Sequence, residues 1–290
     1  MDAHCSPHLP PARDFHRVLS PDAPRQKYNP QPTQALHWGQ LKLLASEIEF
    51  LTPHAHTTGL TVVYAGAAPG HHIPCLASMF PKMRFLLIDP LPFSIEQTSQ
   101  LEIIQAPMTT ELAETLAQHS QTTRSPLLFI SDVRVGPPTP SRESHEQHQR
   151  RIMRDMMAQQ HWHIILKPIQ SVLKFRLPWS IRARSLYLSG SIHLPVFGRP
   201  HTHETRLITD PGEPRLVWYD HTQYEEQMAH FNSVTRVSAH GPNGLCYDCE
   251  ALENIAAQYL HAHGLDPITA PILCEELKAS LFQTNLPTLL

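Results

Sequence analysis

The sequence predicts an α/β protein built around a doubly wound sheet, and three observations lead to this fold class. Short β-branched runs alternate with segments of helical period over residues 38–168. A turn of small residues, Gly66-Ala67-Ala68-Pro69-Gly70, follows the first of these runs. The second run ends in Asp89. A small-residue turn and an acidic strand end are typical of sheets that bind a nucleotide-like ligand at the carboxyl ends of their strands.

The individual elements follow from the spacing of apolar residues. Leu44, Ile48 and Leu51 recur at helical spacing and predict a helix over 38–52. The elements expected after it are strands at 61–66, 83–89, 101–105, 126–133 and 162–168, and helices at 72–80, 109–119 and 143–160. Apolar runs between 174 and 209 are expected to complete the sheet, and residues 222–234 and 246–262 to form helices.

Length and composition predict one domain preceded by an arm. Residues 1–36 are rich in Pro, Gln and His and lack periodicity, so we expect an N-terminal arm, followed by a single domain over 37–290 with a helical C-terminal part. No apolar run approaches the roughly 20 residues of a membrane helix. The first residues also lack the apolar segment of a signal peptide. We therefore expect a cytoplasmic protein without a membrane partner.

The five cysteines do not suggest a disulfide framework, because their number is odd and their spacing irregular. Cys246 and Cys249 form a C-x-x-C motif that is followed by His261 and His263. Zinc sites usually separate their histidines by about 3–5 residues, whereas one residue separates these two. Packing or surface roles are therefore the favoured interpretation, zinc is the alternative, and we predict no metal site.

Charge is segregated along the chain, although the net charge is only -3. Residues 141–185 hold nine basic and three acidic residues, whereas residues 210–290 hold eleven acidic and three basic ones. The basic stretch has two interpretations. Its arginines, among them Arg150, Arg151 and Arg154, either contact phosphates or form a solvated helix face.

Four segments each carry a charged residue where the apolar pattern alone does not require one. These residues are Lys42 on the first helix, Asp132 at the end of the fourth strand, Lys174 in an apolar and aromatic run, and Glu204 before an apolar run. Each has a plain structural alternative: a surface lysine, a strand-end cap, or charges that protect the edge strands of a sheet. The four together indicate a site.

This set and the small-residue turn resemble the Lys-Asp-Lys-Glu tetrad and cofactor loop of RNA 2'-O-methyltransferases. The ordered segments YAGAAPGHHI, LLID, LFISDVR, SVLKFRLPW, HETRLI and YEEQM narrow the resemblance. They resemble the poxvirus family of cap-specific mRNA (nucleoside-2'-O-)-methyltransferases, whose members also serve as the small regulatory subunit of poly(A) polymerase. The resemblance extends from about Tyr28 to the C-terminus.

The resemblance implies a Rossmann-like, S-adenosylmethionine-dependent methyltransferase fold. It also implies methyl transfer to the ribose 2'-hydroxyl of the first transcribed nucleotide of 7-methylguanosine-capped RNA. Carried over by position, the catalytic tetrad is Lys42, Asp132, Lys174 and Glu204. A ribose hydroxyl is a weak nucleophile that must be aligned and deprotonated. We expect Lys174 to act as the base, with its pKa lowered by burial and by Lys42.

The resemblance also implies two binding sites. The positions that match the family's cofactor site are Gly66, Ala67, Pro69, Gly70, His72, Asp89, Pro107, Met108, Asp132 and Val133. Leu91 stands where the family has an arginine. For the cap, the matching positions are Tyr28 and Trp179, which stack on the methylated base, His201 as a side wall, and Glu225, which accepts hydrogen bonds from the guanine edge. Ser180 and Ile181 follow Trp179 where a second carboxylate is expected.

Two other functions remain open. The tetrad and a similar cofactor loop also occur in 2'-O-methyltransferases of other RNA, and Tyr28, Trp179 and Glu225 distinguish that enzyme from one that binds a cap. The third function is that of a non-catalytic RNA-binding processivity subunit of a poly(A) polymerase. The expected partners are capped mRNA and, by the resemblance alone, a poly(A) polymerase catalytic subunit.

Overall fold

A seven-stranded sheet forms the centre of the protein. The computed structural model describes residues 17–29, 36–134, 143–179, 183–240, 245–282 and 288–289. The strand order is β4-β3-β2-β5-β6-β9-β8. The strands are β2 (Thr61–Ala65), β3 (Arg84–Ile88), β4 (Leu101–Ile104), β5 (Leu127–Ser131), β6 (Gln170–Phe175), β8 (Gly190–His193) and β9 (Thr205–Thr209). Strands β4 to β6 are parallel, and β9 is antiparallel to both of its neighbours.

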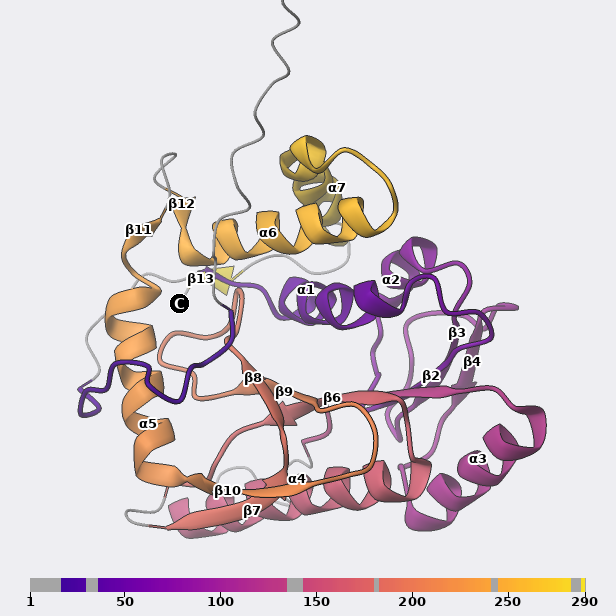
Figure 1. Ribbon diagram of the computed structural model, residues 1–290, viewed down its shortest axis with the longest axis horizontal. Helices are drawn as coiled ribbons and strands as arrows, with labels where there is room; N and C mark the ends of the chain where they lie inside the picture. Colours follow the sequence, from indigo (N-terminus) through magenta and orange to yellow (C-terminus); the bar gives the residue numbers. More distant parts are fainter. Residues whose placement is uncertain are drawn as a thin grey trace, which may run out of the picture.

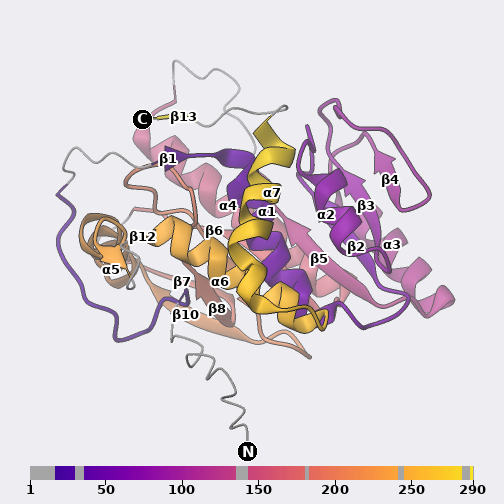
Figure 2. The same cartoon turned by 90° about the horizontal axis from the view of Figure 1, so that it is seen from above.

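Helices cover both faces of this sheet (Figure 1). One face carries α1 (Gly39–Leu51), α2 (Ile73–Met79), α6 (Tyr247–Ala262) and α7 (Ala270–Phe282), and the other carries α3 (Thr110–Thr123) and α4 (His145–Leu166). Figure 2 shows that α6 and α7 lie over α1. Helix α5 (His221–His230) stands beyond the β8 edge and continues into a π-helical turn, Phe231–Thr235. This doubly wound arrangement confirms the predicted fold class.

Three two-stranded pairs and two 3₁₀ turns complete the described structure. The pairs are β1 (Leu36–His37) with β13 (Thr288–Leu289), β7 (Arg184–Leu188) with β10 (Leu216–Asp220), and β11 (Ala239–His240) with β12 (Leu245–Cys246). The 3₁₀ turns are Thr52–His54 and Pro267–Thr269. Within the described ranges, no helix has the length and apolar character needed to cross a membrane.

The centre of the sheet is apolar on both sides, as expected for a parallel sheet covered by helices. The β2 residues Val62, Val63, Tyr64 and Ala65 are fully buried. The hydroxyl of Tyr64 donates to Glu47 of α1 at 2.6 Å, which pairs the one polar atom of these side chains. The sheet and α1 are therefore joined by a buried hydrogen bond as well as by packing.

The segment 162–168 corrects one prediction. We expected a strand there, but α4 continues to Leu166, and the strand β6 follows at Gln170–Phe175. Trp162 and Leu166 are buried and lie four residues apart, while Ile164 is exposed, which is the periodicity of a helix face. Consequently Lys174 lies on an interior strand between β5 and β9, and not on a sheet edge.

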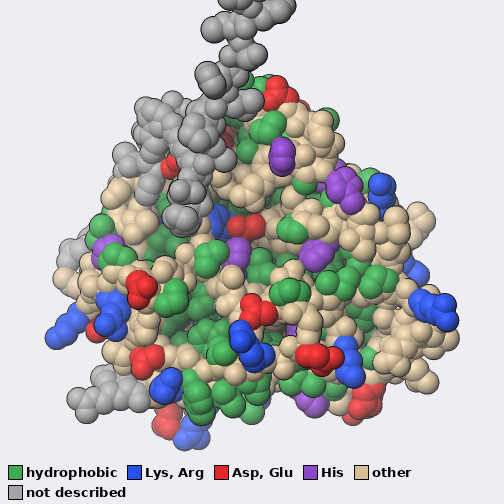
Figure 3. Space-filling view, viewed as in Figure 1, with side chains coloured by type: hydrophobic (Ala, Val, Ile, Leu, Met, Phe, Trp, Pro, Cys, Tyr) green, Lys and Arg blue, Asp and Glu red, His purple; other side chains and the backbone are tan. Residues whose placement is uncertain are grey.

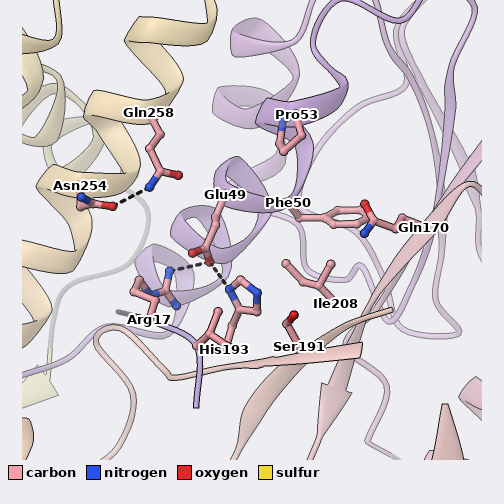
Figure 4. A pocket seen from close by; sticks show the side chains of 11 residues that line it. Arg17, Glu49, Phe50, Pro53, Gln170, Ser191, His193, Ile208, Asn254 and Gln258 are labelled. Atoms are coloured by element: carbon pink, nitrogen blue, oxygen red, sulfur yellow. Dashed lines mark hydrogen bonds and ion pairs between the residues drawn. The ribbon is translucent and has the colours of Figure 1, made fainter. Parts of the chain in front are cut away.

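The described part of the N-terminal arm, residues 17–29, is anchored by a buried ion pair. Arg17 Nη1 lies 2.7 Å from Glu49 Oε2 on α1, and His193 Nδ1 of β8 lies 3.2 Å from the same oxygen. Figure 4 shows these side chains converging at the wall of a pocket of about 420 Å³. Backbone hydrogen bonds continue the attachment, from Leu19 N to Ile192 O at 2.7 Å and from Gln26 N to Glu226 O at 3.0 Å.

A second buried ion pair ties α6 to the loop before β9. Asp248 Oδ2 lies 2.9 Å from Arg236 Nη2, and Asp248 Oδ1 accepts from the Phe197 backbone N–H at 3.0 Å. Arg236 also donates to the carbonyl oxygens of Gly198 and Arg199. The loop is thus held at several backbone atoms by two buried side chains.

Replacement of Asp248 with Ala is expected to lower the free energy of unfolding by about 3–5 kcal/mol, because the buried Arg236 loses its counter-charge. Urea denaturation measures this change. The matched control is Glu146→Ala, which removes the exposed pair with Arg150. The control is expected to leave the free energy nearly unchanged, because surface ion pairs contribute little. Equal stability of Asp248→Ala and wild type would show that the pair does not hold the loop.

Candidate active site

The candidate site lies at the point where the sheet reverses its direction of winding. The chain leaves β2 toward α2 on one face and leaves β5 toward α4 on the other, and the two strands are neighbours. Open α/β sheets bind ligands in the crevice at such a point. The predicted cofactor loop, residues 66–70, follows β2, and Asp132 follows β5, so both lie at this point. Asp132 N donates to Ala65 O at 3.0 Å, which fixes the two strand ends together.

Gly66 makes the close approach of these strand ends possible. Its φ is +81°, and a Cβ at this position would lie 2.9 Å from backbone atoms of Asp132 and Val133. Only glycine accommodates both the left-handed conformation and the contact. The sequence prediction of a glycine-dependent turn at this position therefore has a direct physical basis.

Asp89 lies at the end of β3 beside the cofactor loop. Its Oδ2 accepts from Ala68 N at 3.2 Å and its Oδ1 from Leu91 N at 2.8 Å. An ionised carboxylate offers about four lone-pair sites, so Asp89 retains acceptor capacity for ribose hydroxyls. Met108 follows β4 and Val133 follows β5, and both are apolar side chains at the same edge of the sheet. This combination of an acceptor and apolar surfaces fits an adenosine.

The structure brings the other predicted cofactor residues to this edge with one exception. Pro107 precedes Met108 in the loop after β4, and Ala67, Pro69 and Gly70 belong to the cofactor loop. The ring of His72 does not face the crevice. It is 1% exposed, and its nitrogens lie 2.8 Å from Gln40 and 3.0 Å from Glu47 of α1. The His72 side chain therefore joins the segment after the cofactor loop to α1.

The four predicted tetrad residues meet in one cluster although they come from four elements. Lys174 Nζ lies 3.2 Å from Asp132 Oδ1 and 3.5 Å from Glu204 Oε2. Lys42 Nζ, which comes from α1, donates to Glu204 Oε1 at 2.7 Å. Each lysine therefore contacts at least one carboxylate, and Glu204 bridges the two lysines.

Arg206 is a fifth member of the cluster that the sequence analysis missed. Its Nη2 lies 2.5 Å from Asp132 Oδ1, and its Nη1 lies 3.1 Å from Glu204 Oε1. It is 8% exposed. The signal was present in the sequence, because residues two apart on a strand face the same way and Arg206 follows Glu204 by two. Lys42, Asp132, Lys174, Glu204 and Arg206 are called the charge cluster below.

The charge cluster alters the proton affinity of its members. Burial lowers the pKa of Lys174, and the positive charges of Lys42 and Arg206 add to this effect against the opposing carboxylates. Burial opposes ionisation of Glu204, but the two lysines and Arg206 outweigh it and hold the pKa of Glu204 well below its usual range. Burial likewise opposes ionisation of Asp132, but the charges of Lys174, Arg206 and Lys42 outweigh it and lower the pKa of Asp132. The result is a buried amine with a weakened hold on its proton beside two firmly ionised carboxylates.

Two of the predicted cap residues form a second, aromatic cluster. The Tyr28 and Trp179 rings lie 5.0 Å apart, with an angle of 70° between their planes. The ring of His203 contacts both, at 5.6 Å from Tyr28 and 5.5 Å from Trp179. Tyr28, Trp179 and His203 are called the aromatic slot below. His201, the predicted side wall, precedes His203 by two residues with φ +55°.

Glu225 lies on α5 beside Glu226, whose backbone carbonyl anchors the arm. The Glu226 carbonyl accepts from Gln26 N, two residues before Tyr28. Burial raises the pKa of Glu225, and the neighbouring Glu226 adds to this effect. The backbone of Glu225 also interacts with the imidazole of His203. The structure therefore places the backbone of Glu225, the predicted guanine acceptor, beside the aromatic slot. Ser180 and Ile181 lie outside the described residues.

Two arginines of the basic stretch form ion pairs on or beside α4. Arg150 Nη2 lies 2.6 Å from Glu146, and Arg151 Nε lies 2.8 Å from Glu143. On the face of the molecule seen in Figure 3, Lys and Arg side chains stand singly or beside acidic ones. These contacts favour the helix-face interpretation for both arginines. The described ranges hold no group of three or more His, Cys, Asp or Glu side chains arranged to bind a metal ion, and Cys246 and Cys249 are free thiols.

The sheet order, the two helical layers and the polar strand ends define a Rossmann-like methyltransferase fold. Comparison with known families then identifies the relatives of the chain. The family described as Poly A polymerase regulatory subunit matches residues 20–263. The chain belongs to this family.

Two curated viral proteins illustrate the relationship. A cap-specific mRNA (nucleoside-2'-O-)-methyltransferase of Myxoma virus (strain Lausanne) is 28% identical over 225 residues, which cover 73% of this chain and 65% of that protein. The protein of the same name from Fowlpox virus (strain NVSL) is 29% identical over 215 residues, which cover 68% of each. The matched segment thus spans slightly less than two thirds of the Myxoma virus relative.

The charge cluster makes a prediction for the pKa of Lys174. Both carboxylates favour its protonated form, and Asp132 contributes more than Glu204. Replacement of either carboxylate by its amide is therefore expected to lower the pKa of Lys174, with a larger decrease for Asp132→Asn than for Glu204→Gln. NMR titration of isotope-labelled lysine side chains measures both. A pKa that stays constant or rises would contradict the description of the cluster.

Proposed function

We propose that the chain is an S-adenosylmethionine-dependent, cap-specific mRNA 2'-O-methyltransferase that acts on the first transcribed nucleotide. The observation that carries the proposal is the position of Lys174, a buried amine between two carboxylates at the switch point of the sheet. The names of the Myxoma and Fowlpox virus relatives support the same activity. The cofactor loop and Asp89 provide the surfaces and the acceptor that an adenosine needs.

Lys174 acts on the ribose hydroxyl in this proposal. S-adenosylmethionine, when bound, supplies a methyl group on a positively charged sulfur, which is already activated for transfer. The neutral Lys174 Nζ accepts the 2'-hydroxyl proton as the oxygen attacks the methyl carbon. The oxygen–carbon bond would form as the carbon–sulfur bond breaks, sulfur would keep that electron pair and leave in the neutral thioether, and Lys174 would hold the proton. The sites that hold the two substrates at neighbouring strand ends align the reacting atoms.

The remaining members of the charge cluster position the base and adjust its pKa. Lys42 and Arg206 lower the pKa of Lys174 through their charge. Glu204 and Asp132 fix the orientation of the Lys174 amine through contacts at 3.5 and 3.2 Å. Because only the unprotonated amine accepts a proton, the rate of transfer is expected to rise with pH until Lys174 is neutral.

The aromatic slot binds the cap in this proposal. Methylation makes the guanine cationic, and stacking on electron-rich rings adds about 0.5–2 kcal/mol through the cation–π interaction. At a centroid distance of 5.0 Å, Tyr28 contacts Trp179 directly and leaves no room for a base between them. Tyr28 lies on the arm and is partly exposed, so its ring turns away from Trp179 when the base enters.

A second role as the regulatory subunit of a poly(A) polymerase is favoured by the description of the matching family. The partner in that role is the polymerase catalytic subunit, and the shared ligand is capped mRNA. The charge cluster has no function in processivity alone, so we place the methyltransferase activity first.

Transfer of tritium from labelled S-adenosylmethionine tests the proposal. The substrates are short RNAs that begin with a 7-methylguanosine cap, an unmethylated cap or a triphosphate. Wild-type protein is expected to label the methylated cap RNA, and Lys174→Ala and Lys174→Arg to lose about 10²-fold or more in rate, because neither variant offers a neutral amine.

Lys82→Arg is the matched control, since Lys82 is an exposed lysine in the turn between α2 and β3. It is expected to retain the wild-type rate. Equal labelling of all three RNAs would indicate a 2'-O-methyltransferase of other RNA and would contradict cap specificity. Labelling by Lys174→Arg at the wild-type rate would contradict the role of Lys174. A protein that binds RNA and cofactor without transfer would leave only the regulatory role.

A further inference from the structure

His203 and His221 are buried histidines that each have one ring nitrogen without a partner among the described residues, and His203 is the one that lies in the aromatic slot. The described residues include four buried histidines. Three of them bond a side chain through a ring nitrogen: His72 contacts Gln40 and Glu47, His163 contacts Ser171 at 2.7 Å, and His221 contacts Ser185 at 2.7 Å. His203 is 6% exposed, and its Nε2 has no hydrogen-bond partner among the described residues.

The unpartnered nitrogen belongs to the ring that completes the aromatic slot. His203 contacts both Tyr28 and Trp179, and its backbone is held by the Tyr224 hydroxyl, which donates to His203 O at 2.5 Å. The indole Nε1 of Trp179 is also buried without a partner in the described part of the chain. A buried polar atom without a partner costs about 1–3 kcal/mol. Both atoms thus have hydrogen-bonding capacity that the described residues do not use.

The environment of His203 keeps its imidazole neutral. Burial lowers the pKa of His203 to about 4, and the charges of Arg176 and His201 act in the same direction. A neutral imidazole carries a proton on one nitrogen and offers a lone pair on the other. With its proton on Nδ1, His203 therefore offers a lone pair at Nε2, in a cluster of three aromatic rings.

Guanine is complementary to this arrangement. Its edge carries two adjacent donor groups, the N1–H and the 2-amino group, which together need more than one acceptor. The Glu225 carboxylate is one acceptor, and the imidazole of His203 interacts with the backbone of that same residue. His203 and Glu225 are therefore neighbours at the aromatic slot, and the unpartnered Nε2 of His203 is available as a second acceptor.

We propose that His203 is a specificity-determining residue of the cap site, whose Nε2 accepts a hydrogen bond from the donor edge of the guanine beside Glu225. This inference rests on the proposed cap-specific function. It adds to that function a neutral acceptor that selects guanine by its hydrogen-bonding edge, while the stacking rings select its methylation state.

Two replacements of His203 separate hydrogen bonding from packing. His203→Phe keeps a ring and has no acceptor, whereas His203→Gln has no ring but offers an amide oxygen near the position of Nε2. Binding of the dinucleotide cap analogue with 7-methylguanosine and adenosine is measured by calorimetry on the full chain. His203→Phe is expected to raise Kd about tenfold, which corresponds to about 1.4 kcal/mol. His203→Gln is expected to stay within about threefold of wild type.

Two modified analogues identify the hydrogen bond itself. A 7-methylinosine analogue lacks the 2-amino group, and a 1,7-dimethylguanosine analogue lacks the N1–H. Wild-type protein is expected to bind both analogues more weakly, because Glu225 accepts from one donor and His203 from the other. In His203→Phe the loss is expected to disappear for one analogue only, the one that lacks the donor bonded to His203. His145→Phe is the control, because His145 contacts Trp179 at 6.1 Å from the exposed end of α4. The control is expected to show the wild-type pattern with both analogues.

Three results would overturn the inference. If both His203 variants bind the cap analogue as tightly as wild type, His203 does not contribute to cap binding. If both variants fail to bind it, His203 acts through packing. Equal analogue losses in wild type and His203→Phe would exclude the hydrogen bond. These results leave the proposed methyltransferase intact, since wild type then still binds the cap. Failure of wild type to bind any cap analogue would instead overturn the cap-specific function and the inference together.

Discussion

The ion pairs that Lys174 makes with Asp132 and Glu204 are the interactions on which the site depends, because a buried ammonium without a counter-charge is strongly unfavourable. Arg206 is 8% exposed and shares both carboxylates, and Lys42 shares one. The cluster is thus a closed network in which every charge has an opposite neighbour. The cluster needs β5, β6 and β9 side by side, and the strand order supplies this arrangement.

A chain of backbone contacts connects this cluster to the C-terminal helices. Phe197 donates its N–H to Asp248 of α6, and its carbonyl accepts from Trp38 N at 3.1 Å. The Trp38 carbonyl in turn accepts from Lys42 N at 2.9 Å. Phe197 also lies in the loop between β8 and β9, which leads to Glu204. Helix α6 therefore holds both ends of the Lys42–Glu204 pair in place, although it contributes no side chain to the site.

The parts of the fold that the sequence predicted are those with strong local signals. Strand β2, the glycine turn and the end of β3 each combine a periodic apolar pattern with a residue whose conformation or chemistry is distinctive, and all were confirmed. The segment at Trp162 failed because a short apolar run fits a strand and a helix end equally well. Only packing of Trp162 and Leu166 against the sheet decides between them.

The two residues missed in the site differ in what could have predicted them. Arg206 stands two residues after Glu204 in a segment expected to join the sheet, so local spacing offered a signal. His203 required the path of the arm, which brings Tyr28 to it across 175 residues of sequence. That path is set by pairs such as Arg17 with Glu49, which no local pattern reveals. Family resemblance supplied Lys42 and Lys174 as candidates, and the structure added the distances that join them.

A crystal structure of the chain with S-adenosylhomocysteine and a 7-methylguanosine-capped dinucleotide tests the central claim most directly. The account predicts adenosine between the 66–70 loop and Asp89, the methylated base between Tyr28 and Trp179, and the ribose 2'-oxygen within hydrogen-bond distance of Lys174 Nζ. A ribose hydroxyl remote from Lys174, or a cap bound on another face of the protein, would contradict the claim that the charge cluster performs methyl transfer to capped RNA.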